Sequence, residues 1–593
     1  MKRADLLKSA SVACGALAFA EGATVTPSDA ATRTAADAEL DALLAAEWAD
    51  FRRRNPISAS LAGDRTADDR WDDASPAALA GEASHRRDVL ARMERIGRAR
   101  LSEPAKLDYD LYAGLQRDAL QGYELRTQLF ALTPRSGVQT WAQINDQLRF
   151  ATVADYEHWQ RRLETYPRAV DETIALLREA VAAKMLWPRA SMQRLPPQLD
   201  RLIADPERSE FYEPLTRIPA SIAPPEAARL RERARDAIAN RVNPALRALR
   251  AFVVETYLPA APDAAGLVHV PNGEALYAYF VRTETTTNLT PAEIHALGLR
   301  EVARLRDAME TLAPRTGYRG SLPDVIAALR GDPANYHHTP EALLTAYRAQ
   351  AKRIDPELVK LFRTLPRLPY GVVAIPAALA PDTTTAYYYP GALDGSRAGS
   401  YYVNLYRPEA RPIYEMMVLS LHESVPGHHL QIALAQELRG LPEFRRATLA
   451  YTAFVEGWGL YAESLGHELG LYDDAKSEFG ALTYEMWRAV RLVVDTGIHA
   501  QGWSRERAID YFLANAAKTR LDVTNEVDRY VTDPGQALAY KIGQLKILEL
   551  RERAQTRLGA RFDVRDFHEV VLEQGALPLD VLDRRVGAWL ANA

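Results

Sequence analysis

Three of the chain's twelve histidines, His422, His428 and His429, fall within eight residues, and Glu423 directly follows the first of them. Apolar residues flank this cluster on both sides, so we expect it to lie on a helix that is at least partly buried. Buried imidazole and carboxylate groups need partners. A divalent metal ion can satisfy several of them at once. The cluster therefore predicts metal chemistry.

The spacing of these histidines differs from the zinc-peptidase pattern His-Glu-x-x-His, in which both imidazoles converge from one helix face on a single ion. On a straight helix His422 and His428 would be roughly 120° out of register. Pro426 cannot donate to a helical carbonyl, and Gly427 has the backbone freedom to absorb extra residues. We therefore predict a kink or bulge that loops out two residues and lets His428 converge with His422. His429 is the competing ligand, on nearly the same face but about 10.5 Å along the axis.

A third ligand should come from another helix. Glu456 lies in an otherwise apolar stretch, 28 residues after His428, which leaves room for the first helix to end and the chain to return. An acidic residue in such a stretch is costly to bury unless a charge such as a metal ion neutralises it. Gly457 and Gly459 would permit close helix approach, and Glu463 is a candidate supporting or substitute ligand.

These residues predict one Zn²⁺ held by His422, His428 and Glu456, with water in the fourth position. Glu423 would be the general base. The alternatives are a polar surface patch on a kinked helix and a Glu456 that is simply solvated. A single cysteine excludes a thiolate zinc cluster and an internal disulfide, so any metal ligands must be His, Asp or Glu.

The motif His-Glu-x-x-Pro-Gly-His-His followed by Glu-Gly-Trp resembles the bacterial domain-of-unknown-function 885 family, which is similar in turn to gluzincin-type zinc metallopeptidases. Further segments that look like family blocks lie at residues 393–404, 494–503 and 534–543. The resemblance runs from about residue 35 to the C-terminus. It implies a mostly helical fold with a deep cleft.

Two of these blocks contain further candidate catalytic residues. His499 follows Asp495 by one helical turn, so the carboxylate could orient the imidazole; the alternative is an ordinary helical surface pair. Tyr540 follows a Pro-Gly turn near a helix start, and its phenol could donate to the oxyanion formed during amide hydrolysis. The alternative for Tyr540 is a plain core tyrosine.

Arg397 and Tyr402 are the candidate substrate-binding residues. Arg397 lies in a Gly-rich turn beside Tyr-rich strands, where its guanidinium could clamp a substrate carboxylate through two hydrogen bonds. A structural salt bridge would explain the same arginine.

Hydrophobic periodicity predicts a mainly α fold. Residues from Ala35 to Phe51 have one apolar helical face, and similar patterns recur along the chain. Two further helices should begin at Pro291 and Pro340, each after a threonine cap. Only Thr383–Tyr406 is rich in strand-forming residues, which predicts one or two short β-hairpins. We expect one large catalytic domain with a deep cleft over residues 32–593, with the metal-site core at about 383–548.

The first 31 residues are typical of an export segment rather than of the fold. Lys2, Arg3 and Lys8 precede a short run of small and apolar residues that ends at a small-x-small cleavage site. The pattern resembles a weakened twin-arginine signal and predicts export, to the periplasm rather than the cytoplasm. A frayed N-terminal helix and a lipid anchor at Cys14 are the alternatives.

The overall charge of 73 basic against 78 acidic residues argues against a nucleic-acid partner, and no later apolar stretch is long enough for stable membrane insertion. We therefore expect a zinc-dependent hydrolase of peptide or related amide bonds that acts on short peptides or small amides. The alternatives are a metallohydrolase of non-peptide small molecules and a non-catalytic binding protein with a vestigial site. The presence of Glu423 speaks against the second.

Overall fold

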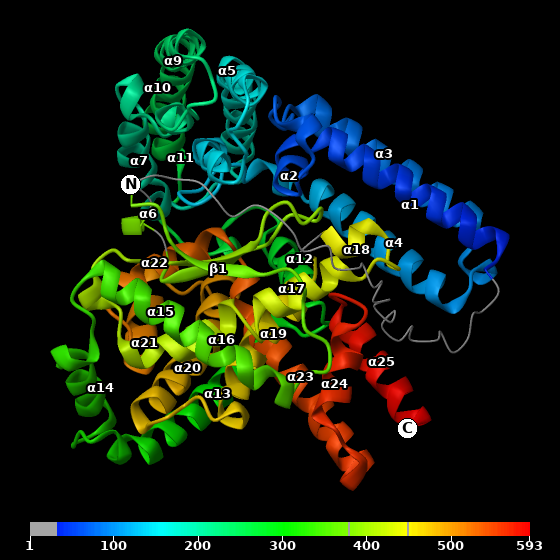
Figure 1. The fold of residues 1–593 in the computed structure, drawn as a ribbon, viewed down its shortest axis with the longest axis vertical. Helices are drawn as coiled ribbons and strands as arrows, with labels where there is room; N and C mark the ends of the chain where they lie inside the picture. The colour runs from blue at the N-terminus through cyan, green and yellow to red at the C-terminus, as the bar shows by residue number, and fades with distance from the viewer. Residues whose placement is uncertain (1–32, 378–379, 383, 448–449) are drawn as a thin grey trace, which may run out of the picture.

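The structure is a computed structural model that describes residues 33–377, 380–382, 384–447 and 450–593. The export segment predicted at residues 1–31, with Cys14, lies outside them. Figure 1 shows a chain of packed helices with one small sheet, so the prediction of a mainly α, multi-helix domain is confirmed. In the part of the chain described, no helix is long and apolar enough to cross a membrane.

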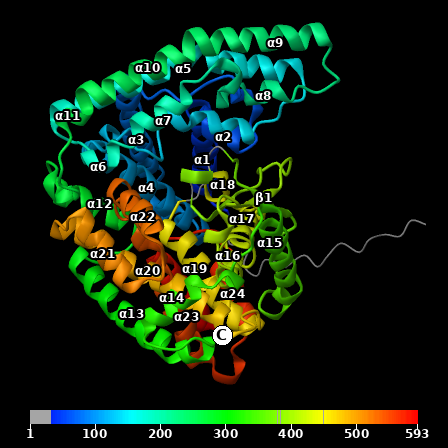
Figure 2. The same cartoon turned by 90° about the vertical axis from the view of Figure 1, so that its left-hand side faces the viewer.

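The first part of the chain is an all-helical block. Its helices are α1 (Ala35–Arg54), α2 (Pro56–Leu61), α3 (Pro76–Ile96), α4 (Glu103–Glu124), α5 (Val153–Ala183), α6 (Arg189–Met192), α7 (Leu195–Leu202), α8 (Glu213–Thr216), α9 (Pro224–Ala237), α10 (Asn243–Phe252) and α11 (Leu258–Ala260). Short π-helical turns join α9, α10 and α11 into one rod. The rod packs beside α5 across the top of the molecule (Figure 2).

The second part of the chain carries the sheet and the remaining helices. These helices are α12 (Gly273–Thr285), α13 (Pro291–Leu312), α14 (Leu322–Gly331), α15 (Pro340–Ile354), α16 (Met416–Glu423), α17 (His428–Glu437), α18 (Glu443–Ala447), α19 (Thr452–Leu469), α20 (Ala475–Gln501), α21 (Arg505–Asn515), α22 (Arg520–Thr532), α23 (Gln536–Leu558), α24 (Val564–Leu572) and α25 (Leu579–Asn592). The starts of α13 and α15 are as predicted, because the hydroxyls of Thr290 and Thr339 accept hydrogen bonds from backbone N–H groups of the first turn.

The sheet has three strands in the order β1-β3-β2. The strands β2 (Ala386–Tyr389) and β3 (Gly399–Val403) are antiparallel, which confirms a hairpin within the predicted strand-rich segment; Thr383 lies outside the described residues. The third strand, β1 (Tyr370–Ala374), pairs in parallel with β3 and was not predicted. It lies in a proline-rich stretch that indicates a loop by composition, and only its long-range pairing makes it a strand.

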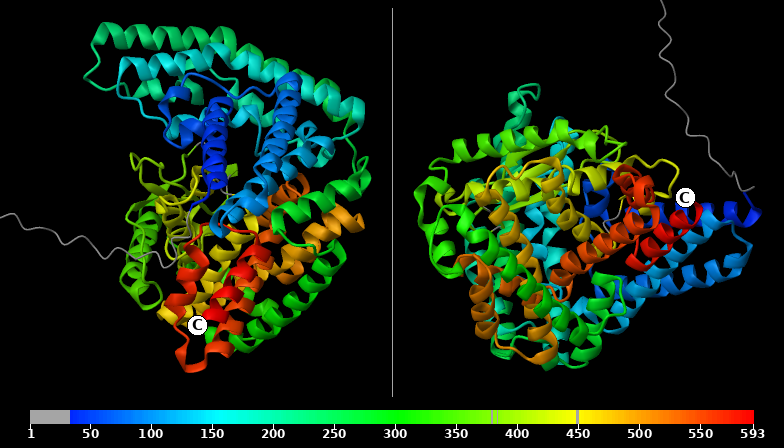
Figure 3. Two further views of the ribbon diagram at one scale, coloured as in Figure 1. Left: turned by 90° about the vertical axis from the view of Figure 1, so that its right-hand side faces the viewer. Right: turned by 90° about the horizontal axis from the view of Figure 1, so that it is seen from below.

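Helices α16 and α17 lie in the centre of this second part. Every residue from Met416 to Ala435 is buried. The two helices are packed among α15, α19, α20, α24 and β2. In the left view of Figure 3 this second part of the chain lies below the helices of the N-terminal block. A polar side chain on α16 or α17 must therefore find its partners inside the protein.

Helices α19 and α23 approach each other closely because glycines face each other at their contact. A Cβ atom built on Gly543 would lie 1.8 Å from the backbone oxygen of Ala453 and 2.7 Å from Cα of Gly457. Neither glycine position has room for a side chain. Because α19 carries Glu456, this contact helps to fix the position of that carboxylate relative to α16.

The close contact predicts the effect of adding one methyl group. Gly543→Ala must push α19 and α23 apart and should lower the free energy of unfolding by about 1–3 kcal/mol, as overpacked cores do. The control is Gly587→Ala in α25, where an added Cβ meets no atom within 4 Å and should stabilise the helix by up to about 1 kcal/mol. Urea unfolding followed by circular dichroism compares them. Equal midpoints for the two variants would contradict the packing described here.

Candidate metal centre

The structure brings His422, His428 and Glu456 together at one point. One ligand atom from each lies within 4.8 Å of the other two. Glu456 Oε2 is 3.5 Å from His422 Nε2 and 3.2 Å from His428 Nε2. The imidazole centroids are 4.6 Å apart and the rings are nearly perpendicular, at 82°. Two nitrogens and one carboxylate oxygen in this arrangement are a donor set suited to a zinc ion with an open position.

A break in the helix produces this convergence. We expected one helix with a bulge, but α16 ends at Glu423 and α17 begins at His428, with a turn between them. Pro426 has no N–H to continue the helical ladder. Gly427 packs against the end of α16, where a Cβ atom would lie 1.9 Å from the carbonyl oxygen of His422. The four-residue interruption removes the register problem that a straight helix would impose.

His429 points away from this group. Its Nδ1 lies 2.9 Å from the hydroxyl of Tyr388, and its ring centroid is 4.6 Å from that of Tyr370. Burial lowers the pKa of His429 to about 4, so the ring is neutral at ordinary pH. Of the two candidates for the second imidazole ligand, the structure places His428 beside His422 and Glu456.

The triad of His422, His428 and Glu456 contains buried polar atoms without hydrogen bonds. His428 Nδ1 and Glu456 Oε2 have no hydrogen-bond partner among the described residues. Burial lowers the pKa of His422, but the neighbouring carboxylates of Glu456 and Glu463 raise it to about 9. Interaction with the two histidines holds the pKa of Glu456 well below its ordinary value, again against the effect of burial. The cluster thus stabilises positive charge at its centre, as a cation site requires. These residues fit a zinc ion.

Glu463 supports the triad and is not part of it. Its Oε1 lies 2.8 Å from His422 Nδ1 and 3.2 Å from Arg488 Nη2. With Nδ1 held in this way, Nε2 of His422 is left to face Glu456, which is the arrangement that orients metal-binding imidazoles. Gly459 makes room for the ring, because a Cβ there would lie 2.8 Å from it.

A pocket of about 280 Å³ opens beside the triad. Glu423, His422, His428 and Glu456 line it, and so does Tyr540 from α23. The ring of Tyr540 lies 6.2 Å from that of His422 and nearly parallel to it. Burial, with the charge of Glu456, raises the pKa of Tyr540 to about 12, so the phenol keeps its proton at neutral pH. It can therefore act as a donor.

His499 lies elsewhere. Its Nδ1 accepts a hydrogen bond from the N–H of Leu267 at 3.2 Å, and its Nε2 donates to the carbonyl of Tyr530 at 2.9 Å. Asp495 does not orient this ring as we expected, because it accepts from the hydroxyl of Tyr277 at 2.6 Å instead. His499 does not line the pocket. Its ring joins α20 to two other segments of buried backbone, at Leu267 and Tyr530, which is a structural role.

The two residues predicted to bind substrate also lie outside the lining of this pocket. Arg397 donates to the carbonyls of Pro390 and Leu61, at 2.9 and 3.2 Å, and so ties its turn to the N-terminal block. The Tyr402 hydroxyl accepts from Gln147 at 3.2 Å. Both side chains are instead engaged in contacts with the N-terminal block, through Leu61 and Gln147.

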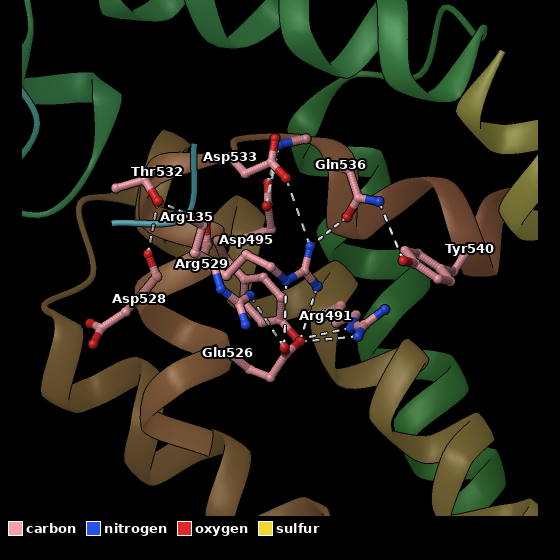
Figure 4. Close-up of polar contacts among 12 residues, drawn as sticks. Arg135, Arg491, Asp495, Glu526, Asp528, Arg529, Thr532, Asp533, Gln536 and Tyr540 are labelled. Atoms are coloured by element: carbon pink, nitrogen blue, oxygen red, sulfur yellow. Dashed lines mark hydrogen bonds and ion pairs between the residues drawn. The ribbon is translucent and has the colours of Figure 1, made fainter. Parts of the chain in front are cut away.

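Sequence reasoning missed four arginines that line the pocket. They are Arg135 from a loop of the N-terminal block, Arg488 and Arg491 from α20, and Arg529 from α22. Figure 4 shows Arg135, Arg491 and Arg529 gathered around Glu526, with Tyr540 close by. One signal was present in the sequence, since Arg488 and Arg491 interrupt a long apolar run of α20. Buried arginines in such a run need specific partners.

Two solved structures illustrate the similarity of the chain to known folds. It is 29% identical to a protein from Colwellia psychrerythraea that is provisionally described as a lipoprotein, with a TM-score of 0.87 over 94% of this chain and 100% of that one. A protein from Shewanella oneidensis, provisionally described as a lipoprotein of unknown function, shares the fold at 17% identity. That TM-score is 0.69 over 92% of this chain and 99% of that one. None of the curated proteins matches the chain.

The sequence profile of one protein family, described as bacterial proteins of unknown function, matches residues 56–586. This match spans both helical blocks and the sheet. It includes the triad, Glu423 and Tyr540. The chain therefore belongs to this family, which is designated DUF885.

Proposed function

We propose that the protein is a zinc-dependent hydrolase of peptide or related amide bonds in short substrates. The observation that carries this proposal is the convergence of His422, His428 and Glu456 in one pocket with Glu423. Glu423 is 8% exposed and adjoins the first ligand in the sequence. A site that only bound metal would not need a carboxylate base facing the same pocket.

In this mechanism His422, His428 and Glu456 would hold the zinc ion. The ion would supply Lewis acidity and lower the pKa of water. Glu423 takes one proton from the attacking water and passes it to the amide nitrogen, which leaves as an amine. The Tyr540 hydroxyl donates to the carbonyl oxygen as negative charge develops there. Glu463 holds the His422 ring in place throughout.

The dimensions of the pocket favour small substrates. About 280 Å³ lies at the lower end of the volumes of small-molecule sites, and the triad lies inside the protein. A folded protein could not bring a peptide bond to this point, so we expect short peptides or small amides.

We also propose that the chain is exported to the periplasm, because its N-terminal segment resembles a signal and both structural relatives are described as lipoproteins.

The ligand set can be tested by matched histidine variants. His428→Ala, His422→Ala and Glu456→Ala should each lose zinc, because each removes one of three ligands, whereas His429→Ala should retain it. Metal content is measured by mass spectrometry of the protein after dialysis in zinc-limited buffer, with circular dichroism as a check of folding. A His429→Ala variant that loses zinc while His428→Ala keeps it would reverse the assignment.

The role of Glu423 can be separated from that of the ligands. Glu423→Gln should keep a full equivalent of zinc but lose at least about 10²-fold in kcat, because only the general base is removed. Steady-state kinetics on the best peptide from a mass-spectrometric digest of a peptide library measure the effect. Loss of the metal itself would mean that Glu423 is a ligand. Unchanged kcat would remove it from the mechanism.

Tyr540 should act on the transition state more than on substrate binding. We expect Tyr540→Phe to lower kcat by about 10²-fold with little change in KM, as the loss of one oxyanion donor does. The control is Tyr461→Phe, which removes a buried hydroxyl that pairs with His568, outside the pocket lining. A Tyr540→Phe variant with kcat equal to that of the control would show that the phenol does not stabilise the oxyanion.

A further inference from the structure

The arginines beside the triad form a second polar group in the same pocket. Glu526 accepts hydrogen bonds from Arg491 Nη2 and from Arg529 Nη2, each at 3.0 Å, and lies 4.0 Å from Arg135 Nη1. The Tyr530 hydroxyl also donates to it, at 2.8 Å. Figure 4 shows these arginines around the one carboxylate. These three arginines, Arg135, Arg491 and Arg529, form one wall of the pocket, which we call the arginine wall. They come from the N-terminal block, α20 and α22, so distant parts of the chain build it together.

The positive charges in this wall exceed the negative ones. Three guanidinium groups surround Glu526, and the next carboxylate beside this group is Asp533, 3.8 Å from Arg529. Burial lowers the pKa of Arg135, and the nearby charges of Arg529 and Arg194 act in the same direction, against that of Glu526. A structural ion-pair network would balance its charges, because an uncompensated buried charge is costly. This wall has at least one positive charge to spare.

Arg491 is the member whose hydrogen bonds are incomplete. The residue is 4% exposed, and its Nη1 has no hydrogen-bond partner among the described residues. Its guanidinium carbon lies 4.5 Å from the ring centre of Tyr540, and that ring lies 6.2 Å from the ring of His422. One tyrosine ring therefore links the arginine wall to a metal ligand, and the two groups line one pocket.

Arg135 is a member of this wall that a ligand can reach from solvent. Its side chain is 34% exposed, while that of Arg491 is 5% exposed. It also lines a neighbouring pocket of about 500 Å³, which shares Thr384, Thr385 and Trp487 with the first. An anionic group entering from that side meets Arg135 before it reaches the triad.

We propose that Arg135, Arg491 and Arg529 bind a free carboxylate of the substrate, one or two residues beyond the bond cleaved at the metal centre. An extended chain advances about 3.3–3.6 Å per residue, and a short spacer suits two groups that lie on either side of one tyrosine ring. Planar guanidinium groups suit a carboxylate because they can donate two parallel hydrogen bonds. This inference rests on the proposed function and makes the enzyme specific for peptides or acyl amino acids with a free C-terminus.

The test uses binding without turnover. A library of N-acetylated dipeptides, half with free C-terminal carboxylates and half amidated, is mixed with the zinc-loaded full-length Glu423→Gln variant. Peptides retained through rapid gel filtration are identified by mass spectrometry. Free acids should be retained at least about tenfold better than the matching amides, because charge-assisted hydrogen bonds are lost on amidation.

Two variants in the same background locate the carboxylate site. Arg135→Gln, at a partly exposed position, and Arg491→Lys, which keeps the charge but loses the planar fork, should each reduce the preference for free acids at least about threefold and leave the retention of amides unchanged. The matched control is Arg397→Gln, outside the pocket lining, which should keep the full preference. Bound zinc and melting temperature report on the integrity of each variant.

The outcomes separate this inference from the proposed function. Equal retention of acids and amides, retention of neither, or a full preference in both Arg135→Gln and Arg491→Lys would overturn the carboxylate site. Loss of the preference in Arg397→Gln alone would move it to Arg397. If the wild-type protein cleaves no peptide while the arginine-dependent preference is found, the carboxylate site stands and peptide hydrolysis falls. If the wild-type protein instead cleaves free and amidated peptides equally, peptide hydrolysis stands and the carboxylate site falls.

Discussion

The backbone between Glu423 and His428 decides where both imidazoles of the candidate metal centre point. A continuous helix would turn His422 and His428 away from each other. The break leaves polar backbone groups inside the protein, and each must find a partner. Trp458 donates its indole N–H to the carbonyl of Pro426 at 2.8 Å, and the N–H of His429 donates to the carbonyl of Ser424 at 3.0 Å. The interruption is therefore a satisfied and fixed part of the core.

The contact between Trp458 and Pro426 also sets the position of the third candidate ligand, Glu456. Trp458 lies on α19 two residues after Glu456, so the helix that donates a hydrogen bond to the backbone of the break also carries the carboxylate of Glu456. Glu463, further along α19, holds the far nitrogen of His422. One helix thus supplies a candidate ligand, a supporting carboxylate and a backbone partner, and its glycine contact with α23 fixes its distance from that helix.

Helix α20 connects the metal centre with the arginine wall. Arg488 pairs with Glu463 behind the triad, and one turn later Arg491 pairs with Glu526. Tyr540 lies between the two groups, near both His422 and Arg491. A shift of α20 would therefore move the support of the metal ligands and the wall of the pocket together. In the mechanism proposed here, this coupling places the bound end of a substrate and the reacting bond at a fixed separation.

The sequence was most informative where the chemistry is local. His422, Glu423 and His428 lie within seven residues, and Pro426-Gly427 between them indicated a break, although not its form as two separate helices. Glu456 was identifiable because a carboxylate in an apolar helix needs a partner. Arg135 could not be identified, since it lies near Glu526 only through the packing of the N-terminal block against α22. Arg397 and His499 were assigned catalytic or binding roles because arginine and histidine side chains often have such roles. In the structure both side chains bind backbone groups instead, and the spacing of residues in the sequence does not reveal those contacts. The parallel strand β1 depends on a partner that lies about 30 residues away in the sequence.

We propose that the broken helix and α19 form one zinc site with two imidazole ligands and a carboxylate. X-ray absorption at the zinc edge of the purified, metal-loaded protein tests it most directly. We expect a four- or five-coordinate ion with two imidazole nitrogens at about 2.0–2.1 Å, and oxygens from Glu456 and solvent at about 2.0–2.2 Å. A shell of oxygens alone, only one imidazole, or no stoichiometric metal would contradict it.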